Sequence, residues 1–559
     1  MSVDQPPTLE ADLLRIKRLY FEHGWLDCTI QLAQVQEDTQ QHTVRLVIAL
    51  NEGQRTRVTA VTLEGTLPAD VPPVETLLAA LPLRPEQPLT KAAFEQSKAL
   101  LRTHLHNAGY ARAQIVPQTV VDPEQHTATV TFTLVPGAQT VFGQIAIRGA
   151  QQVDESALRR HLPLHPGQRV SDQALSDSAD ALYNLGMFQA VTPRALNPDA
   201  VGEPLDVAFD VIERKPRSLQ FSVGYSTAEG FRTEVQWAYR NLRRAAEQLT
   251  LSGRLSAFEQ KTEARLLLPY FLAARTAFSA LLFVRNEQEI DINPFGRLFG
   301  VRKEAQPAFD LLSIGTEARV EHRFTDTLTG LVGLGVSRND FRRVNQEALT
   351  ALEQEIAEDN ILVTQLVEAQ WNSTNSLLNP SRGLSVRGRL EHASTALFSD
   401  VNFVKLLFEV RHYLPVGWQV IVATRLKLGG IYPYANSTEV PFNVRFFAGG
   451  SGSVRGFALN RLGPVNQEGD PIGGMSLFEG GTELRFPLIG ELGVVLFADF
   501  GNVFRAPFHY RFNALRYAVG PGLRYNTPVG PFRLDVGFII EPRPSDDFGR
   551  IEFSIGQAF

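Results

Sequence analysis

The chain has 559 residues, of which 44% are hydrophobic and 20% charged, as expected for a folded protein of more than one domain. Its net charge of -6 excludes the strongly basic surface typical of nucleic-acid-binding proteins. The single cysteine, Cys28, excludes an internal disulfide and a cysteine-rich metal site. The sequence has no run of about 18 apolar residues, so we expect no transmembrane helix.

The N-terminal part of the chain mixes helical and strand patterns and repeats itself. Three amphipathic helical patterns each end at a glycine, Gly24, Gly109 or Gly186, and an aromatic residue follows within two positions. Glycine suits this place because the residue after a helix is commonly left-handed. Alternating strands follow, such as HTATVTFTLV and PLDVAFDVI. The repeat predicts modules of strand, helix, helix, strand and strand, of which the first lacks its opening strand and helix.

These patterns predict a partial module at residues 1–55, complete modules at 56–139 and 140–216, and a different region at 217–559. Generic α+β domains without a shared role are the alternative interpretation of the repeats. Small mixed domains of this kind have exposed edge strands, which can bind extended peptides by strand addition.

From Ser218 onward, helical patterns nearly vanish and the segments alternate between apolar and polar residues. In GPFRLDVGFII, Arg533 and Asp535 lie on one face of the strand and apolar residues lie on the other. Charged residues in mid-strand are typical of strands between lipid and a wet lumen. Sixteen segments alternate in this way, and their connections are short at one end and long at the other. The pattern predicts a 16-stranded antiparallel transmembrane β-barrel, with the preceding modules on the short-turn side.

One long outer loop contains VRFFAGGSGSVRGFALNRLGP, in which glycines surround Arg455. A dinucleotide-binding loop is excluded because Arg455 occupies the place of the last glycine and no parallel strand-helix unit follows. A hydrolase nucleophile turn is excluded because Ser453 occupies the place of a glycine. The eleven histidines show no convincing metal spacing. We therefore expect no catalytic residues, no metal and no cofactor, and a protein that is not an enzyme.

The segment FFAGGSGSVRGF resembles the signature of the barrel-assembly superfamily of outer-membrane proteins, and GGTELRFPL and LFADFGNVF match as companion segments. The resemblance covers nearly the whole chain. It implies α+β POTRA repeats followed by a 16-stranded antiparallel transmembrane β-barrel of the surface antigen type. Within that superfamily, the small number of modules is most similar to the translocation and assembly module subunit, TamA.

The resemblance also implies that the arginine loop is locked inside the lumen. The locking motif is formed by Val454, Arg455, Gly456 and Phe457. Strand alternation places Glu483 and Asp499 on the lumenal face, so we expect Arg455 to pair with Asp499, with Glu483 nearby. The alternative is an Arg455 that lies in solvent on a mobile loop.

The barrel closes where its first predicted strand, SLQFSVGYS, meets its last, GRIEFSIGQAF. Both strands contain glycine, and Gln557 interrupts an otherwise apolar row, features that weaken strand pairing. We expect a lateral seam formed by Phe221, Gly224, Gly556 and Phe559, whose C-terminal residues pair poorly and act as a gate. A fully sealed seam is the alternative.

Together these observations predict an outer-membrane factor that inserts or exports β-rich client polypeptides. Its modules are expected in the periplasm, where they engage clients or a periplasmic or inner-membrane partner, with no role for nucleic acid. The first residues, MSVDQPPTLEADLL, lack the basic and apolar regions of a signal peptide. The alternatives are a two-partner secretion transporter that passes a dedicated client through the pore, and a surface enzyme carried on a barrel.

Overall fold

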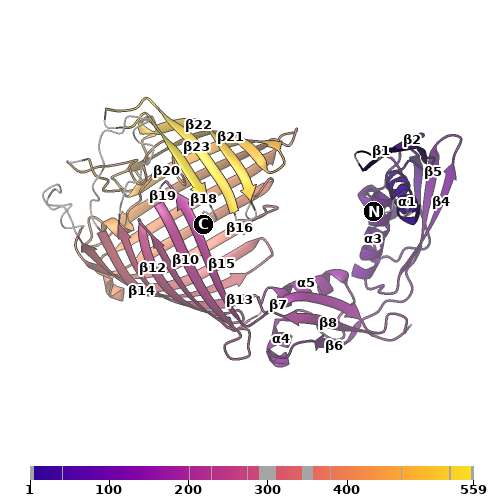
Figure 1. Ribbon diagram of the computed structural model, residues 1–559. Helices are drawn as coiled ribbons and strands as arrows, with labels where there is room; N and C mark the ends of the chain where they lie inside the picture. Colours follow the sequence, from indigo (N-terminus) through magenta and orange to yellow (C-terminus); the bar gives the residue numbers. More distant parts are fainter. Residues whose placement is uncertain are drawn as a thin grey trace. The chain divides into compact units, whose positions relative to one another are not determined.

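The computed structural model describes residues 6–38, 40, 42–200, 202–227, 230–273, 275–288, 310–342, 350, 357–377, 379–467, 469–527, 530–544 and 546–555. The chain folds into two compact units, one with the N-terminal modules and one with a barrel (Figure 1). Among the described residues, no helix combines the length and the apolar character that crossing a membrane requires.

The first module is a helix and a hairpin. It contains α1 (Pro6–Glu22), β1 (Thr29–Asp38) and β2 (Thr43–Asn51). The two strands pair antiparallel and form a sheet of their own. Gly24 follows the helix with φ +97°, the left-handed conformation that its position in the sequence predicted. Every residue of β2 is exposed, and within the described residues this sheet consists of β1 and β2 alone.

The next two modules each have the predicted order of strand, helix, helix, strand and strand. The first contains β3 (Arg57–Glu64), α2 (Val74–Ala80), α3 (Lys91–Asn107), β4 (Gln114–Asp122) and β5 (Thr127–Val135). The second contains β6 (Phe142–Arg148), α4 (Glu155–His161), α5 (Asp172–Tyr183), β7 (Phe188–Ala195) and β8 (Leu205–Glu213). In both sheets the last strand is central, parallel to the opening strand and antiparallel to the other.

Local sequence explains these modules. Thr90 and Ser171 begin the longer helices, and each side-chain oxygen accepts a hydrogen bond from a backbone N–H of the first turn. The central strand β5 buries every second residue, so that Phe132 is packed with Leu101 and Leu105 of the helix. A strand of period two and a helix of period 3.6 thus share one core.

The same main-chain contact joins successive modules. The N–H of Thr56 donates to the carbonyl of Gly24 at 2.8 Å, and the N–H of Thr140 donates to the carbonyl of Gly109 at 2.8 Å. Both threonines are buried. The glycine that ends the helix of one module therefore receives the first residue of the next module, with the same geometry at both joints.

Among the described residues, sixteen antiparallel strands close a barrel, which confirms the predicted architecture. The strands are β9 (Arg217–Ser226), β10 (Gly230–Arg240), β11 (Gln248–Ser256), β12 (Glu259–Leu268), β13 (Thr276–Gln288), β14 (Asp310–Arg323), β15 (Leu328–Arg342), β16 (Asn360–Asn372), β17 (Gly383–Ala393), β18 (Phe403–Pro415), β19 (Ile421–Pro433), β20 (Ser476–Ile489), β21 (Leu492–Phe504), β22 (Arg516–Thr527), β23 (Gly530–Ile540) and β24 (Gly549–Ile555).

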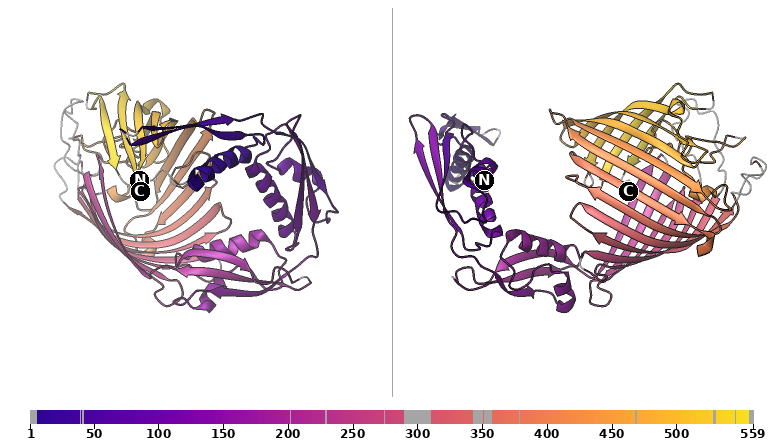
Figure 2. Two further views of the ribbon diagram at one scale, coloured as in Figure 1. Left: turned by 45° about the vertical axis from the view of Figure 1, so that its right-hand side comes forward. Right: turned by 180° about the vertical axis from the view of Figure 1, so that it is seen from behind.

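The wall of this barrel is visible from behind in Figure 2, with neighbouring strands side by side. Its inner face carries the mid-strand charges, and many of them form ion pairs two residues apart on one strand. Examples are Lys261–Glu263 at 2.6 Å, Arg285–Glu287 at 3.1 Å and Arg411–Glu409 at 2.7 Å. Residues two apart on a strand lie on the same face. The charges that the sequence placed in mid-strand are thus neutralised locally along the lumen.

Candidate functional site: the arginine loop and the barrel seam

The connection between β19 and β20, described over residues 434–467 and 469–475, lies against the inner wall of the barrel. Most of its buried apolar side chains share one hydrophobic cluster with residues of the strands from β16 to β23. Two limbs of the loop also pair with each other: the N–H of Phe446 donates to Gly474 at 2.9 Å, and the N–H of Gly474 donates back at 3.0 Å. The loop is therefore a packed plug rather than a solvent-exposed segment.

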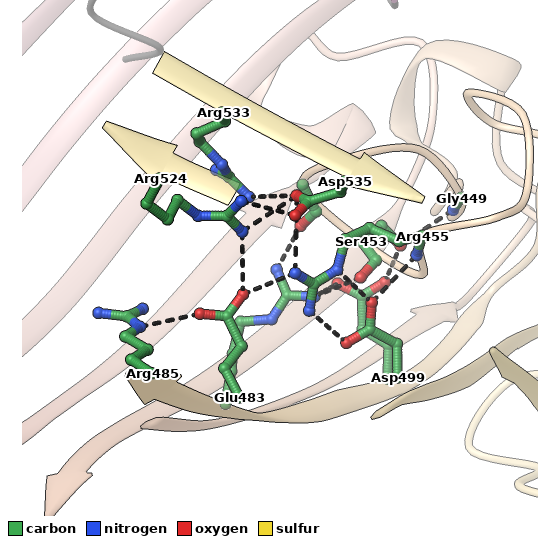
Figure 3. Close-up of polar contacts among 12 residues, drawn as sticks. Gly449, Ser453, Arg455, Glu483, Arg485, Asp499, Arg524, Arg533 and Asp535 are labelled. Carbon is green, nitrogen blue, oxygen red and sulfur yellow. Dashed lines mark hydrogen bonds and ion pairs between the residues drawn. The ribbon is translucent and has the colours of Figure 1, made fainter. Parts of the chain in front are cut away.

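Arg455 lies at the centre of this contact and is buried (Figure 3). Its Nε and Nη2 donate to the two carboxylate oxygens of Asp499 on β21, at 2.7 and 2.8 Å. Its backbone N–H donates to the same carboxylate at 3.1 Å. Its Nη1 donates to Glu483 on β20 at 2.6 Å. Arginine suits this place because its planar fork can bind a carboxylate with two parallel hydrogen bonds.

Two further groups complete the surroundings of Arg455. The guanidinium lies 3.6 Å from the ring centre of Phe497, and its Nη1 is 3.8 Å from Asp535 on β23. Burial opposes the charge of the guanidinium, but Asp499, Glu483 and Asp535 outweigh it and raise the pKa of Arg455 above its usual range. Arg455 therefore stays positively charged, and it interacts with acids on three strands, β20, β21 and β23.

The acids around Arg455 are themselves held by other arginines of the wall. Arg524 on β22 donates to both oxygens of Asp535, at 2.6 and 3.0 Å. Arg485 donates to Glu483 at 2.9 Å, as Figure 3 shows. The alternating pattern of the sequence predicted that Asp535 lies on the lumenal face. It did not predict the contact with Arg455, because the face of a residue does not indicate which strands a loop contacts.

The glycine of the motif lets two backbones meet. Gly456 has φ +91°, and it lies against Gly537 on β23. A Cβ on Gly537 would lie 2.5 Å from the backbone nitrogen of Gly456. The neighbours Val454 and Phe457 are buried in the shared cluster, and the guanidinium of Arg516 lies 5.1 Å from the ring centre of Phe457. All four motif residues therefore contact the wall.

A second set of contacts, from β18, β19 and β20, also anchors the loop, and sequence analysis did not predict it. Arg425 on β19 donates through Nη2 to the carbonyl of Ser453 at 2.7 Å and through Nη1 to that of Gly452. The hydroxyl of Ser453 donates to Glu479 on β20. Lys405 on β18 donates to the carbonyl of Val444 at 2.7 Å. These acceptors are mainly backbone carbonyls, which every residue has, so no side-chain pattern reveals them.

The seam between β24 and β9 is the other candidate site. Within the described residues, only two residue pairs join these strands, Ser554 with Ser226 and Ile555 with Tyr225. The backbone of Phe553 adds two hydrogen bonds to Thr227, at 3.0 and 3.2 Å.

The predicted seam residues divide into two groups. Phe221 is exposed on the outer face of β9, and Gly224 is buried on the same strand. Gly556 and Phe559 lie outside the described residues.

The acids and arginines around Arg455 also extend to the last strand, because Asp535 is paired in register with Glu552 of β24, and both are buried. Within the described part of the chain, no three His, Cys, Asp or Glu residues are arranged to hold a metal.

Comparison with known families agrees with this geometry. The model of the Omp85 superfamily domain matches residues 241–559, which is more than half of the chain. The chain belongs to the Omp85 superfamily. The model of the surface antigen variable number repeat, POTRA, matches residues 56–137 and 140–214, which are the two complete modules. Omp85 membership and the closed barrel place the protein in an outer membrane.

Individual relatives give the same picture. The chain is 23% identical to the outer membrane protein assembly factor BamA of Nitratidesulfovibrio vulgaris, over 99% of this chain and 68% of the relative. A crystal structure of BamA from Haemophilus ducreyi lacking POTRA domains 1–3 superposes with a TM-score of 0.66 at 18% identity, over 89% of this chain and 99% of that one. CdiB from Escherichia coli gives a TM-score of 0.50 at 14% identity, over 99% of both chains.

At these sequence identities, the two solved structures indicate only the fold of this Omp85 protein and not its function. The greater likeness to TamA that the number of modules suggests is not tested by these relatives and stays a prediction.

Proposed function

We propose that this Omp85 protein inserts β-rich client polypeptides into the outer membrane, without covalent chemistry, and that the seam between β24 and β9 is the place of insertion. The observation that carries the proposal is the match to the Omp85 superfamily domain over residues 241–559, together with the similarity to outer membrane protein assembly factors. The seam is the place where the first and last strands of the barrel meet, at Ser554 with Ser226 and Ile555 with Tyr225. An unpaired strand edge is a template for another strand.

The seam is suited to this role because of what the membrane demands. Backbone groups cannot face lipid without hydrogen-bond partners. A seam that opens therefore gains from any client strand that pairs with β9. The sequence similarity to assembly factors such as BamA of Nitratidesulfovibrio vulgaris supports this assignment.

The N-terminal modules would hold clients or a periplasmic or inner-membrane partner. In the two complete modules, β4 and β7 are edge strands. β4 exposes Val116, Val120 and Val121, so it offers both free backbone groups and apolar side chains. Strand addition at such an edge binds extended polypeptides through their main chain.

A reversible lock on the seam tests the proposal. Ser226 and Ser554 are paired in register, so the double variant Ser226→Cys, Ser554→Cys can form a disulfide across the seam. The matched control is Gln236→Cys, Ser252→Cys, a pair within the fully joined strands β10 and β11. The full chain is reconstituted in phospholipid vesicles, and the folding of an added β-barrel client is measured with and without reductant.

We expect the seam disulfide to abolish client folding and reductant to restore it, while the control disulfide has no effect. Full activity of the locked seam would show that the gate is wrong. Passage of a dedicated client through the lumen, as in a two-partner secretion transporter, would then be the better account.

A further inference from the structure

Glu552, on the last strand of the barrel, is a buried acid that has no partner among the described residues. It is 6% exposed, and it faces Asp535 of β23 in register. Its Oε2 atom is buried and accepts no hydrogen bond, and the carboxylate forms no ion pair within the described part of the chain. A buried acid without a partner is costly, because nothing replaces the hydrogen bonds that water would give it. Such a group requires an explanation beyond packing.

The residue opposite Glu552 is itself an acid. Asp535 is held by other groups: Arg524 donates to both of its oxygens, at 2.6 and 3.0 Å, and Arg533 donates to it at 3.4 Å (Figure 3). Residues directly opposite on antiparallel strands have Cβ atoms about 4.5–5.5 Å apart, and like charges there destabilise the pairing. An ionised Glu552 therefore opposes the attachment of β24 to β23.

One other pair of acids faces each other in register within the described strands of the barrel, and that pair is balanced. Glu259 of β12 lies opposite Glu287 of β13. Arg254 lies 3.4 Å from Glu259, and Arg285 lies 3.1 Å from Glu287, so each acid has its own cation. Among the described residues, the unbalanced pair thus occurs at the strand that closes the barrel.

The arginines around Glu552 are engaged with other acids. Arg455 of the loop donates to the acids of β20 and β21, and the arginines of β22 and β23 hold Asp535. Arg550, two residues away on the same face of β24, lies 3.6 Å from Asp547. A turn of any of these guanidinium groups toward Glu552 would break a contact that it already makes. The charge of Glu552 therefore acts on its own strand.

We propose that Glu552 is a positioning residue for client insertion: its charge holds the last strand loosely against β23, so that β24 can leave its contacts at the seam. The inference rests on the proposed role of the seam. Asp535 is fixed by Arg524, whereas Glu552 has no contact of this kind, so the repulsion displaces β24 and not β23. Ser554, two residues beyond Glu552 on the same face, pairs with Ser226 of β9, which brings the displaced part of the strand to the seam itself.

This role differs from structural support in the sign of its effect on stability. A residue that only supports the fold lowers both stability and activity when it is replaced. A neutral residue of the same size in place of Glu552 should instead stabilise the barrel, because it removes the repulsion and its amide can donate a hydrogen bond to Asp535. Stability and activity should then change in opposite directions.

The variant Glu552→Gln tests the proposal in the full chain, reconstituted in phospholipid vesicles. Three quantities are measured: the temperature at which heating changes the electrophoretic mobility of the barrel, the amide hydrogen exchange of β24 (Gly549–Ile555), and the folding rate of an added urea-unfolded β-barrel polypeptide. We expect a higher unfolding temperature, several-fold slower exchange in β24 and several-fold slower folding of the added polypeptide. An unfolding temperature that falls or stays the same, or unchanged exchange in β24, would overturn the proposal.

Two further variants separate charge from shape. Glu552→Asp keeps the charge and should match the wild type in all three measurements; behaviour like that of Glu552→Gln would mean that shape matters and would overturn the proposal. Glu409→Gln on β18 is the matched control. Glu409 pairs with Arg411 at 2.7 Å and faces Arg387 in register, so its replacement should lower the unfolding temperature and leave the exchange of β24 unchanged.

The measurements also separate this proposal from the function on which it rests, because hydrogen exchange involves no client. If the seam disulfide blocks client folding and Glu552→Gln leaves it unchanged, Glu552 has no part in insertion and this proposal alone is wrong. If neither change affects client folding, the seam is not the place of insertion and both proposals are wrong.

Discussion

Two regions of the same sheet differ sharply in how they are held. Where β20 to β23 meet the arginine loop, one guanidinium contacts acids on three strands, and a backbone contact with Gly537 fixes the loop further. At the seam, the described parts of β24 and β9 share two residue pairs. The arginine contact joins the loop to three strands through side chains, whereas the described contact at the seam is made mainly by main-chain atoms of two strands.

Arg455→Ala is expected to have the largest effect on the tightly held region. It leaves Asp499 buried without its partner and removes one of the arginines that hold Glu483, which costs about 3–5 kcal/mol in a desolvated setting and less where water enters. The loop should become sensitive to protease. The barrel should also unfold at a lower temperature, which the change in its electrophoretic mobility after heating measures. Arg461→Ala is the matched control, since Arg461 lies on the same loop and is more exposed.

The pairing itself is tested by a double-mutant cycle. Asp499→Asn should resemble Arg455→Ala, and the double variant should cost less than the sum of the two. Strictly additive effects would mean that the two side chains do not interact.

Gly537→Ala is expected to have the next largest effect, because the new methyl group would overlap the backbone of Gly456. Overpacking of this kind costs about 1–3 kcal/mol. The loop should be displaced, which limited proteolysis of the folded protein measures. Gly388→Ala on β17 is the control, since no atom lies within 4 Å of the added carbon. Equal behaviour of both variants would exclude a close contact between loop and strand.

Lys405→Met probes the second anchor of the loop. It removes the hydrogen bond to Val444 and the contact of the ammonium with the ring of Phe446, at 4.7 Å. A hydrogen bond from a charged group contributes about 1.5–3 kcal/mol, and the methionine recovers part of this by packing. The loss of stability should be smaller than for Arg455→Ala. A larger loss of stability than for Arg455→Ala would mean that Lys405 on β18, and not Arg455, is the main anchor of the loop.

Thr227→Val is expected to have the smallest effect, about 0.5–1.5 kcal/mol, and it acts on the seam. The valine keeps the shape of the side chain but cannot accept the hydrogen bond from the N–H of Phe553. Amide hydrogen exchange should become faster at β24 and stay unchanged at β20 and β21. Unchanged protection of β24 would show that residues beyond this contact hold the seam.

The sequence predicted the barrel well because one physical constraint acts on every strand. A residue between lipid and lumen must be apolar or polar according to its face, so alternation marks both the strands and the lumenal acids Glu483 and Asp499. The resemblance of the arginine motif to the family signature predicted that the loop is held inside the lumen by Arg455. Register across the seam could not be predicted, because face alternation fixes which side a residue faces but not its partner. The contacts of Lys405 and Arg425 with main-chain carbonyls could not be predicted either, because every residue has a carbonyl and no side-chain pattern marks the acceptor.

The repeated joint between modules separates a constant feature from a variable one. Thr56 and Thr140 meet Gly24 and Gly109 through the same backbone hydrogen bond. The side-chain contacts around it differ, because Lys91 pairs with Glu22 at the first joint, whereas Arg112 donates to the hydroxyl of Thr140 at the second. A backbone hydrogen bond makes no demand on side-chain identity, so it can be repeated between modules whose sequences differ.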